Sequence, residues 1–171
     1  MARQKLSMNS TDRNRQTSMH AGSNDPLNAK VLRYLARDRP QSPAFAPFDA
    51  AADAYSGAGC HPEIVERLWD QIGAALPVDC RCLIHGTPAL AHPESGVILA
   101  TGIGTQYALL LTSALAKEAI LAGAKKTTVW TGGGSLDVQQ SFGADWVLGA
   151  WLDRETGWCR TFYDSLHTAE S

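Results

Sequence analysis

The sequence predicts an α+β fold with two N-terminal helices, a mainly antiparallel sheet of about five strands, and one helix inserted between the two halves of that sheet. Three observations support this prediction. Apolar residues recur at helical spacing up to Pro77, and short apolar runs bounded by turn residues follow. A longer Ala- and Leu-rich segment then interrupts these runs. We expect residues 24–171 to form one α+β domain.

The composition bounds the size and class of the protein. A chain of 171 residues that is 44% hydrophobic can bury one core, which favours a single domain. No apolar run approaches the roughly 18 residues of a membrane span, and the polar N-terminus lacks the apolar region of a secretory signal. We therefore expect a cytoplasmic protein without a membrane partner.

Basic residues are concentrated near the N-terminus. Residues 1–39 hold eight Lys or Arg and three Asp, although the whole chain has a net charge of -2. Residues 1–23 contain too little apolar surface to offset the entropy cost of folding, which predicts a disordered basic arm. Such an arm suits a nucleic acid, but no aromatic residue stands between Arg3 and Arg15 to stack on bases. We therefore do not expect a nucleic-acid partner.

The first helix is predicted where this polar segment ends. Asn24 or Asp25 is a suitable N-cap, and Pro26 follows at the first helical position. The helix should end before Arg39 and Pro40, since a residue that precedes proline avoids the α-helical region. Its apolar side is expected to contain Leu27, Val31, Tyr34 and Leu35.

A long connector leads to the clearest element of the chain. Phe45, Phe48 and Tyr55 are expected to anchor this connector on the body of the domain. The second helix has Pro62 in its first turn and should end at Pro77. Its apolar positions keep helical spacing, at Ile64, Val65, Leu68, Trp69, Ile72 and Leu76.

Strands are predicted after this helix. A turn with proline first and glycine last, at residues 93–96, separates the second strand from the third. The three strands are expected over residues 82–85, 88–92 and 97–101.

A hairpin is predicted at the C-terminus, with strands over residues 146–152 and 158–163. Trp151 and Trp158 would then lie close enough to pair across it. Alternation along a strand places Trp146 on the opposite face from Trp151, so at least one ring would face away from a one-sided core. An exposed tryptophan favours a partner, and we therefore expect a homodimer or higher oligomer.

The segment between the two groups of strands allows two interpretations. In the first, residues 106–122 form one helix after a Gly-Ile-Gly-Thr loop. In the second, residues 106–111 form a strand paired with residues 97–101, and Thr112 or Ser113 caps a shorter helix that ends at Gly123. We favour the second interpretation, because the longer helix would be apolar on all sides up to Lys117.

The first interpretation resembles the nucleoside phosphorylase family over about 35 residues. In that family a strand ends in a Thr-Gly-Ile-Gly-like loop, and a helix and a strand lead to a Thr-Gly-x-x-Gly-like turn, here residues 131–135. The resemblance implies phosphate and nucleoside contacts near Gly102, Gly104 and Thr131, with Gly132 in the same turn. We do not assign the chain to the family, because only a short tail follows Ser135, too little for the second half of that fold and its catalytic acid.

Three polar residues are candidates for a catalytic role. Two strands joined by Gly86 and Thr87 would bring His85 and His92 near each other, with Glu94 in the following turn. Imidazole and carboxyl groups in such an arrangement suit general acid–base chemistry.

No metal or other cofactor is expected. Cys80 and Cys82 are separated by one residue rather than two, and no second pair follows, so the spacings of zinc sites are missing. The four cysteines, which include Cys60 and Cys159, are expected to be thiols. Ser135 is predicted to cap a short helix through Gln140 instead of binding a ligand.

Two classes of function remain open from the sequence. The first is a non-enzymatic binding or self-association protein, which we favour. The second is a small-molecule-binding protein or enzyme that uses His85, His92, Glu94 and the glycine-rich turns with Gly102 and Gly104. A cavity with convergent polar groups would favour the second class.

Overall fold

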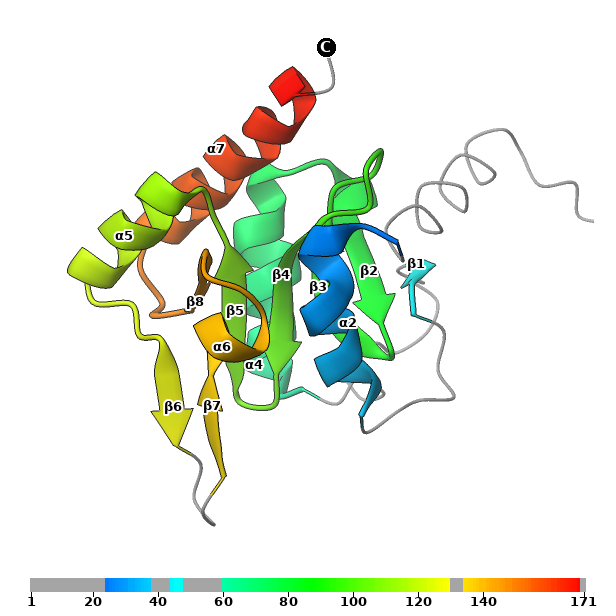
Figure 1. Cartoon of the computed structure of the whole chain (residues 1–171). Helices are drawn as coiled ribbons and strands as arrows, with labels where there is room; N and C mark the ends of the chain where they lie inside the picture. Colours follow the sequence, from blue (N-terminus) through cyan, green and yellow to red (C-terminus); the bar gives the residue numbers. More distant parts are fainter. Residues whose placement is uncertain (1–23, 38–43, 48–59, 130–133, 170–171) are drawn as a thin grey trace, which may run out of the picture.

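The computed structural model describes residues 24–37, 44–47, 60–129 and 134–169. In these segments a six-stranded antiparallel sheet has the order β1-β2-β3-β4-β5-β8, and β6 pairs with β7 in a separate small sheet, which confirms the predicted α+β fold (Figure 1). The strands are β1 (Ala46–Pro47), β2 (Arg81–Ile84), β3 (Thr87–Ala91), β4 (Ile98–Ile103), β5 (Gln106–Leu110), β6 (Thr127–Val129), β7 (Ser135–Asp137) and β8 (Trp146–Leu148).

Helices cover both faces of the large sheet (Figure 1). The helical segment that begins with α4 packs behind the sheet together with α7, and α2 and α6 lie in front of it. α5 lies at the end of the sheet and contacts β8. The helices are η1 (Pro26–Asn28), α2 (Ala29–Ala36), α4 (Pro62–Glu66), η2 (Arg67–Ile72), η3 (Gly73–Ala75), η4 (Val78–Cys80), α5 (Ser113–Leu121), α6 (Val138–Ser141) and α7 (Arg154–Ala169).

The second predicted helix is present, although it changes its winding along its length. His61 caps it, with Nδ1 accepting a hydrogen bond from the backbone N–H of Glu63 at 3.2 Å. α4 continues as the π-helical η2 and ends in the 3₁₀ turn η3. Arg67, the first residue of η2, is buried, which the apolar spacing did not predict. The six predicted apolar residues are all buried, namely Ile64, Val65, Leu68, Trp69, Ile72 and Leu76.

The first helix has the predicted cap and length. The Asp25 side chain accepts a hydrogen bond from the backbone N–H of Leu27 at 2.9 Å, and α2 ends well before Pro40. Val31 and Leu35 are buried, but the inclusion of Leu27 in the apolar side is wrong, since it is half exposed. Leu27 lies in the 3₁₀ turn η1, whose tighter winding rotates it away from the apolar side of α2.

Asn28 ties this helix to the turn between β3 and β4. Its side-chain amide donates to the carbonyl of Gly96 at 2.8 Å, and its amide oxygen accepts from the N–H of Ile98 at 2.9 Å. The residue is fully buried, so these bonds satisfy polar groups that are removed from water.

The favoured interpretation of the middle segment is confirmed. β4 and β5 form a tight hairpin with Ile103 opposite Gln106, and Gly104 in its turn has a φ of +62°. The Thr112 side chain accepts from the N–H of Leu115 at 3.2 Å and caps α5. Gly123 follows the helix with a φ of +112°, as a C-terminal glycine does.

The predicted C-terminal hairpin is wrong, because residues 158–163 belong to α7. Buried positions recur at helical spacing along α7, at Glu155, Trp158, Cys159, Phe162 and Tyr163. Trp151 and Trp158 therefore do not pair across strands. Trp146 and Trp158 are buried in the core, whereas Trp151 is 48% exposed, so one of these rings does face away from the core, although not on a hairpin. The homodimer stays a prediction.

One smaller prediction, the cap of α6, is also wrong. Asp137, and not Ser135, caps the short helix α6, since its carboxylate accepts from the N–H of Gln140 at 3.0 Å. Phe45 packs against the core as expected, while Phe48, Tyr55 and the arm over residues 1–23 lie outside the described residues. None of the described helices is long and apolar enough to cross a membrane.

Candidate functional site

A buried cluster of three polar side chains joins η2, β5 and α7. An Nη2 to Oε1 ion pair of 2.9 Å connects Arg67 to Glu155, and the Tyr107 hydroxyl donates a hydrogen bond to the same carboxylate oxygen. Nε of Arg67 donates to the Tyr107 hydroxyl at 3.3 Å. All three residues are less than 8% exposed. The cluster therefore fixes three elements that are far apart in sequence relative to one another.

The remaining polar atoms of this cluster also have partners. Arg67 donates to the carbonyl of Leu152 at 2.7 Å and to Oε1 of Gln71 at 2.9 Å. Oε2 of Glu155 accepts from the N–H of Ala150 at 2.8 Å. Burial, together with the hydrogen bond to Glu155, raises the pKa of Tyr107 far above its ordinary value, so the phenol stays protonated. A cluster whose polar atoms all have partners rigidifies the loop that it holds, here residues 149–153 between β8 and α7.

That loop carries Trp151 in an unusual backbone conformation. Its φ is +58°, in the left-handed region that non-glycine residues rarely adopt. The backbone N–H of Trp151 donates to the Tyr107 hydroxyl at 2.8 Å, and the guanidinium of Arg67 lies 5.5 Å from the centre of its ring. The indole meets the Tyr107 ring edge-on at 5.3 Å and remains 48% exposed. The buried cluster therefore holds a large aromatic ring at the surface.

The Trp151 ring lies on a groove of about 750 Å³. The segment that follows α5 supplies Lys125, Thr127 and Thr128 to the lining, and the loop after β8 supplies Gly149 and Trp151. The groove is in the size range of small-molecule sites. The described residues that line it include a lysine but no Asp or Glu, so its charge favours an anion.

Glycine at position 149 is required for this arrangement. A Cβ atom there would overlap the ring of Tyr107, and the N–H of Gly149 donates to the Tyr107 carbonyl at 2.7 Å. The other side of the groove is ordered by a bond of 2.6 Å from the Gln106 amide to the Thr128 hydroxyl. Both walls of the groove are thus fixed without a ligand.

Two of the predicted ligand-binding residues, Gly102 and Gly104, lie in the β4–β5 hairpin. Gly102 is buried in β4, where a Cβ atom would come within 2.5 Å of Sγ of Cys60. Gly104 forms the β4–β5 turn, and its carbonyl accepts from the N–H of His61 at 3.0 Å. Thr131 and Gly132 lie outside the described residues.

The candidate catalytic residues fall into two places. His85 precedes β3 in the turn that contains Gly86, whereas His92 follows β3 at its other end, so this turn does not bring the two histidines together. His92 and Glu94 instead lie beside His167 from α7, with one ligand atom of each within 4.8 Å of the others. His92 is 1% exposed, while the side chains of Glu94 and His167 are 64% and 42% exposed.

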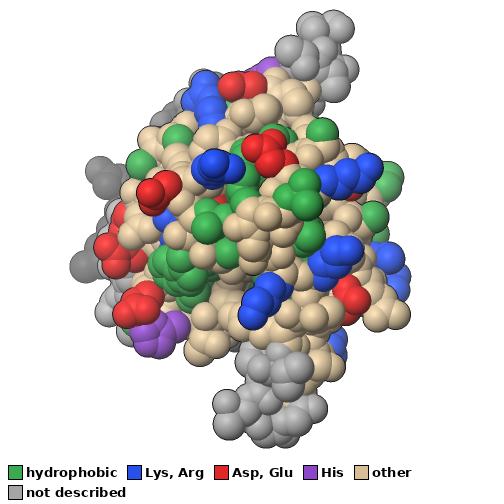
Figure 2. Space-filling view, turned by 90° about the vertical axis from the view of Figure 1, so that its left-hand side faces the viewer, with side chains coloured by type: hydrophobic (Ala, Val, Ile, Leu, Met, Phe, Trp, Pro, Cys, Tyr) green, Lys and Arg blue, Asp and Glu red, His purple; other side chains and the backbone are tan. Residues whose placement is uncertain are grey.

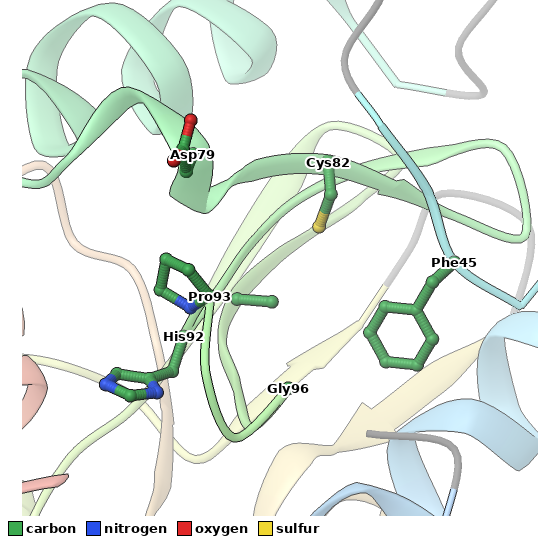
Figure 3. Close-up of a pocket in the computed structure, with 7 residues that line it drawn as sticks. Phe45, Asp79, Cys82, His92, Pro93 and Gly96 are labelled. Atoms are coloured by element: carbon green, nitrogen blue, oxygen red, sulfur yellow. The ribbon is translucent and has the colours of Figure 1, made fainter. Parts of the chain in front are cut away.

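A small cavity of about 20 Å³ lies next to His92. Figure 3 shows the Cys82 thiol and the Phe45 ring pointing into it, and the imidazole of His92 pointing away from both. This volume holds about one water molecule, so the cavity does not enlarge the histidine cluster into a substrate site.

The cysteines are buried thiols, as predicted. Burial raises the pKa of Cys80, Cys82 and Cys159 to about 12, so these groups are not thiolates near neutral pH. Nucleophilic cysteine chemistry has no support at these three positions.

Sequence reasoning missed Arg67, Tyr107, Glu155 and His167, and it placed Trp151 on a strand of a hairpin that the structure does not contain. A charged residue in a helix is ordinarily solvated, and nothing in the sequence marks Arg67 and Glu155 as partners. The spacing of apolar residues along α7 was the available signal for placing Glu155 on a buried face.

Comparison of the chain with protein-family models, with curated proteins and with solved structures finds no match.

Proposed function

We propose that this protein is a non-enzymatic binding protein that holds a small anionic molecule with a flat ring in the groove beside Trp151. The half-exposed indole, held in a left-handed backbone conformation at the edge of the groove, is the observation that carries this proposal. Such strain costs on the order of 1–3 kcal/mol and persists only where surrounding contacts over-determine it. Strained residues of this kind cluster at binding sites.

The groove supplies complementary chemistry for such a ligand. The indole face offers a stacking surface, and Lys125, which also lines the groove, offers a positive charge. The Thr128 hydroxyl, which accepts a hydrogen bond from the Gln106 amide, can donate its own proton to an anionic oxygen. Binding requires little reorganisation, because the buried cluster already fixes the loop that carries Trp151.

The buried cluster itself supports binding more than catalysis. Glu155 is 1% exposed, and both of its carboxylate oxygens accept hydrogen bonds from the protein. The Tyr107 hydroxyl is likewise engaged by Glu155, Arg67 and Trp151. A general acid or base must reach its substrate, whereas these groups face one another. We assign them the role of positioning Trp151.

The test is a thermal-shift and tryptophan-fluorescence titration with adenosine 5′-monophosphate, benzoate and inorganic phosphate. Saturation at 100 times Kd is worth about 2.7 kcal/mol, which corresponds to roughly 5–10 °C in Tm for a chain of this size. We expect a ring-bearing anion to stabilise the protein more than phosphate does.

Matched variants distinguish binding in the groove from non-specific binding elsewhere on the protein surface. Trp151→Ala and Lys125→Ala should each weaken binding at least tenfold. Lys117→Ala and Leu121→Ala change exposed residues of α5 that line a different hollow, and should leave binding unchanged. The proposal fails if none of the three probes binds, or if Trp151→Ala binds as tightly as the wild type.

We infer self-association as a second candidate function from the surface of α5. Figure 2 shows the face that carries α5, β6 and β8, where hydrophobic side chains lie among charged ones. Leu121 is 89% exposed beside a hollow of about 630 Å³ that also includes Ile120 and Ala116. Light scattering at micromolar concentration should give a dimer that Leu121→Glu dissociates. A wild-type mass of 18.4 kDa would exclude this second candidate.

A further inference from the structure

The turn after β3 and the end of α7 bring three metal-ligating side chains together. His92 and Glu94 come from the turn, and His167 comes from the last turns of α7. One ligand atom of each lies within 4.8 Å of the other two. This juxtaposition is independent of the groove beside Trp151, since none of the three residues lines that groove.

Two of the three ligands are held in place by neighbouring residues. Nδ1 of His92 lies 2.9 Å from the Ser95 hydroxyl and accepts from the Ser95 N–H at 3.0 Å. Nε2 of His167 lies 3.0 Å from the Tyr163 hydroxyl, which leaves Nδ1 facing Oε2 of Glu94 at 3.9 Å. The two imidazole rings meet edge-on, with their centres 4.8 Å apart.

We propose that His92, Glu94 and His167 bind a divalent transition-metal ion of the zinc class, with water in the remaining coordination positions. Two imidazoles and one carboxylate form a donor set that such ions prefer. Zinc holds these atoms at about 2.0–2.2 Å, so they lie roughly 3.5 Å apart around the ion. The ligand atoms must approach by about 1 Å, and the exposed side chains of Glu94 and His167 have room for this movement.

The hydrogen-bond partners allow both histidines to ligate as neutral imidazoles. When Nδ1 of His167 binds the ion, its Nε2–H donates to the Tyr163 oxygen. Ser95 contacts Nδ1 of His92, so Nε2 is the ligating nitrogen of that ring. When Nε2 binds the ion, the imidazole proton is carried by Nδ1, which donates it to the Ser95 hydroxyl oxygen. The Ser95 N–H then loses its acceptor, which weakens metal binding, and we expect a Kd for zinc that is roughly micromolar.

The site would join two segments that the sequence places far apart. Asn28 already ties the turn after β3 to the first helix through Gly96. A bound ion adds a connection from this turn to the last turns of α7. Because the ion binds the native arrangement, its binding should also raise the Tm of the protein.

The test is calorimetric titration of the full, reduced chain with zinc chloride, followed by titration with cobalt chloride under an absorption spectrometer. We expect one zinc ion per chain and a cobalt spectrum without thiolate charge-transfer bands. Glu94→Gln and His167→Ala should each weaken zinc binding at least tenfold and abolish the rise in Tm. Both side chains are largely exposed, so these variants should fold.

The control is His85→Asn, which removes a histidine at the opposite end of β3 and should bind zinc as the wild type does. The proposal is overturned if the wild type binds no zinc at micromolar concentration. It is also overturned if Glu94→Gln and His167→Ala both retain wild-type binding, or if cobalt shows thiolate ligation.

Discussion

The backbone N–H of Trp151 donates a hydrogen bond to the hydroxyl of Tyr107, 2.8 Å away, and this bond fixes the one half-exposed ring among the described tryptophans. The Tyr107 hydroxyl also donates a hydrogen bond to Glu155 and accepts one from Arg67. A surface aromatic residue is therefore positioned by a tyrosine hydroxyl and two charged groups that are almost completely buried. The first three predictions concern this arrangement.

Tyr107→Phe should lower the free energy of unfolding by about 2 kcal/mol, because it leaves the Trp151 N–H and the Nε–H of Arg67 without their acceptor and removes one hydrogen bond to Glu155. For a chain of this size the Tm should fall by roughly 4–8 °C. Tyr163→Phe is the control, since that hydroxyl bonds to the largely exposed His167 and its loss should cost about 0.5 kcal/mol or less. Equal losses in the two variants, measured by urea denaturation, would contradict the prediction.

Arg67→Met should cost about 3–5 kcal/mol, because it leaves the buried carboxylate of Glu155 without its counter-charge. The double variant with Glu155→Leu should cost at least about 1 kcal/mol less than the sum of the two single changes.

A double-mutant cycle on Arg160 and Asp164 provides the comparison. This pair has a similar N–O distance, 3.1 Å, but is about half exposed, and its coupling should stay below about 0.5 kcal/mol. Additive effects at Arg67 and Glu155 in urea unfolding would show that the buried ion pair is not coupled.

Trp151→Gly should be more stable than Trp151→Ala by about 1 kcal/mol, although glycine ordinarily destabilises a folded chain. The φ of +58° is strained for alanine and unstrained for glycine. Both variants lose the indole, so both should lose binding of a ring-bearing anion equally. An alanine variant as stable as the glycine variant in chemical denaturation would mean that residue 151 carries no backbone strain.

The buried thiols predict a loss of stability at alkaline pH. Burial raises the pKa of Cys82 and Cys159 from 9.0 in the unfolded chain to about 12. Between these values the unfolded chain holds fewer protons than the native protein, so the free energy of unfolding falls as pH rises. Each thiol contributes up to about 1.4 kcal/mol per pH unit within this window.

Urea denaturation at several pH values between about 7.5 and 10.5 measures how the free energy of unfolding changes with pH, and so checks the sign and the slope of this decline. A variant with both cysteines replaced by alanine should show a shallower decline above pH 9. A decline of the same slope in the variant would assign the alkaline loss to other groups.

Local sequence signals predicted the elements that are defined by contacts between residues a few positions apart. The helix that starts at Pro62 and the β4–β5 hairpin follow from apolar spacing, caps and turn glycines. The same reasoning gave a hairpin in place of α7, because a polar loop ending in Gly157 fitted a turn as well as a helix start. The helical spacing of the residues that α7 buries was the better guide.

Periodicity and capping act over a few residues, so the α+β class, most of the helix and strand positions, and the burial of the cysteines could be predicted from the chain alone. That Arg67 meets Glu155, 88 residues further along the chain, and that His167 lies beside Glu94 became visible in the folded molecule. Such partners are chosen by the packing of distant elements and by the need to satisfy buried charges, and neither leaves a fixed spacing in the sequence.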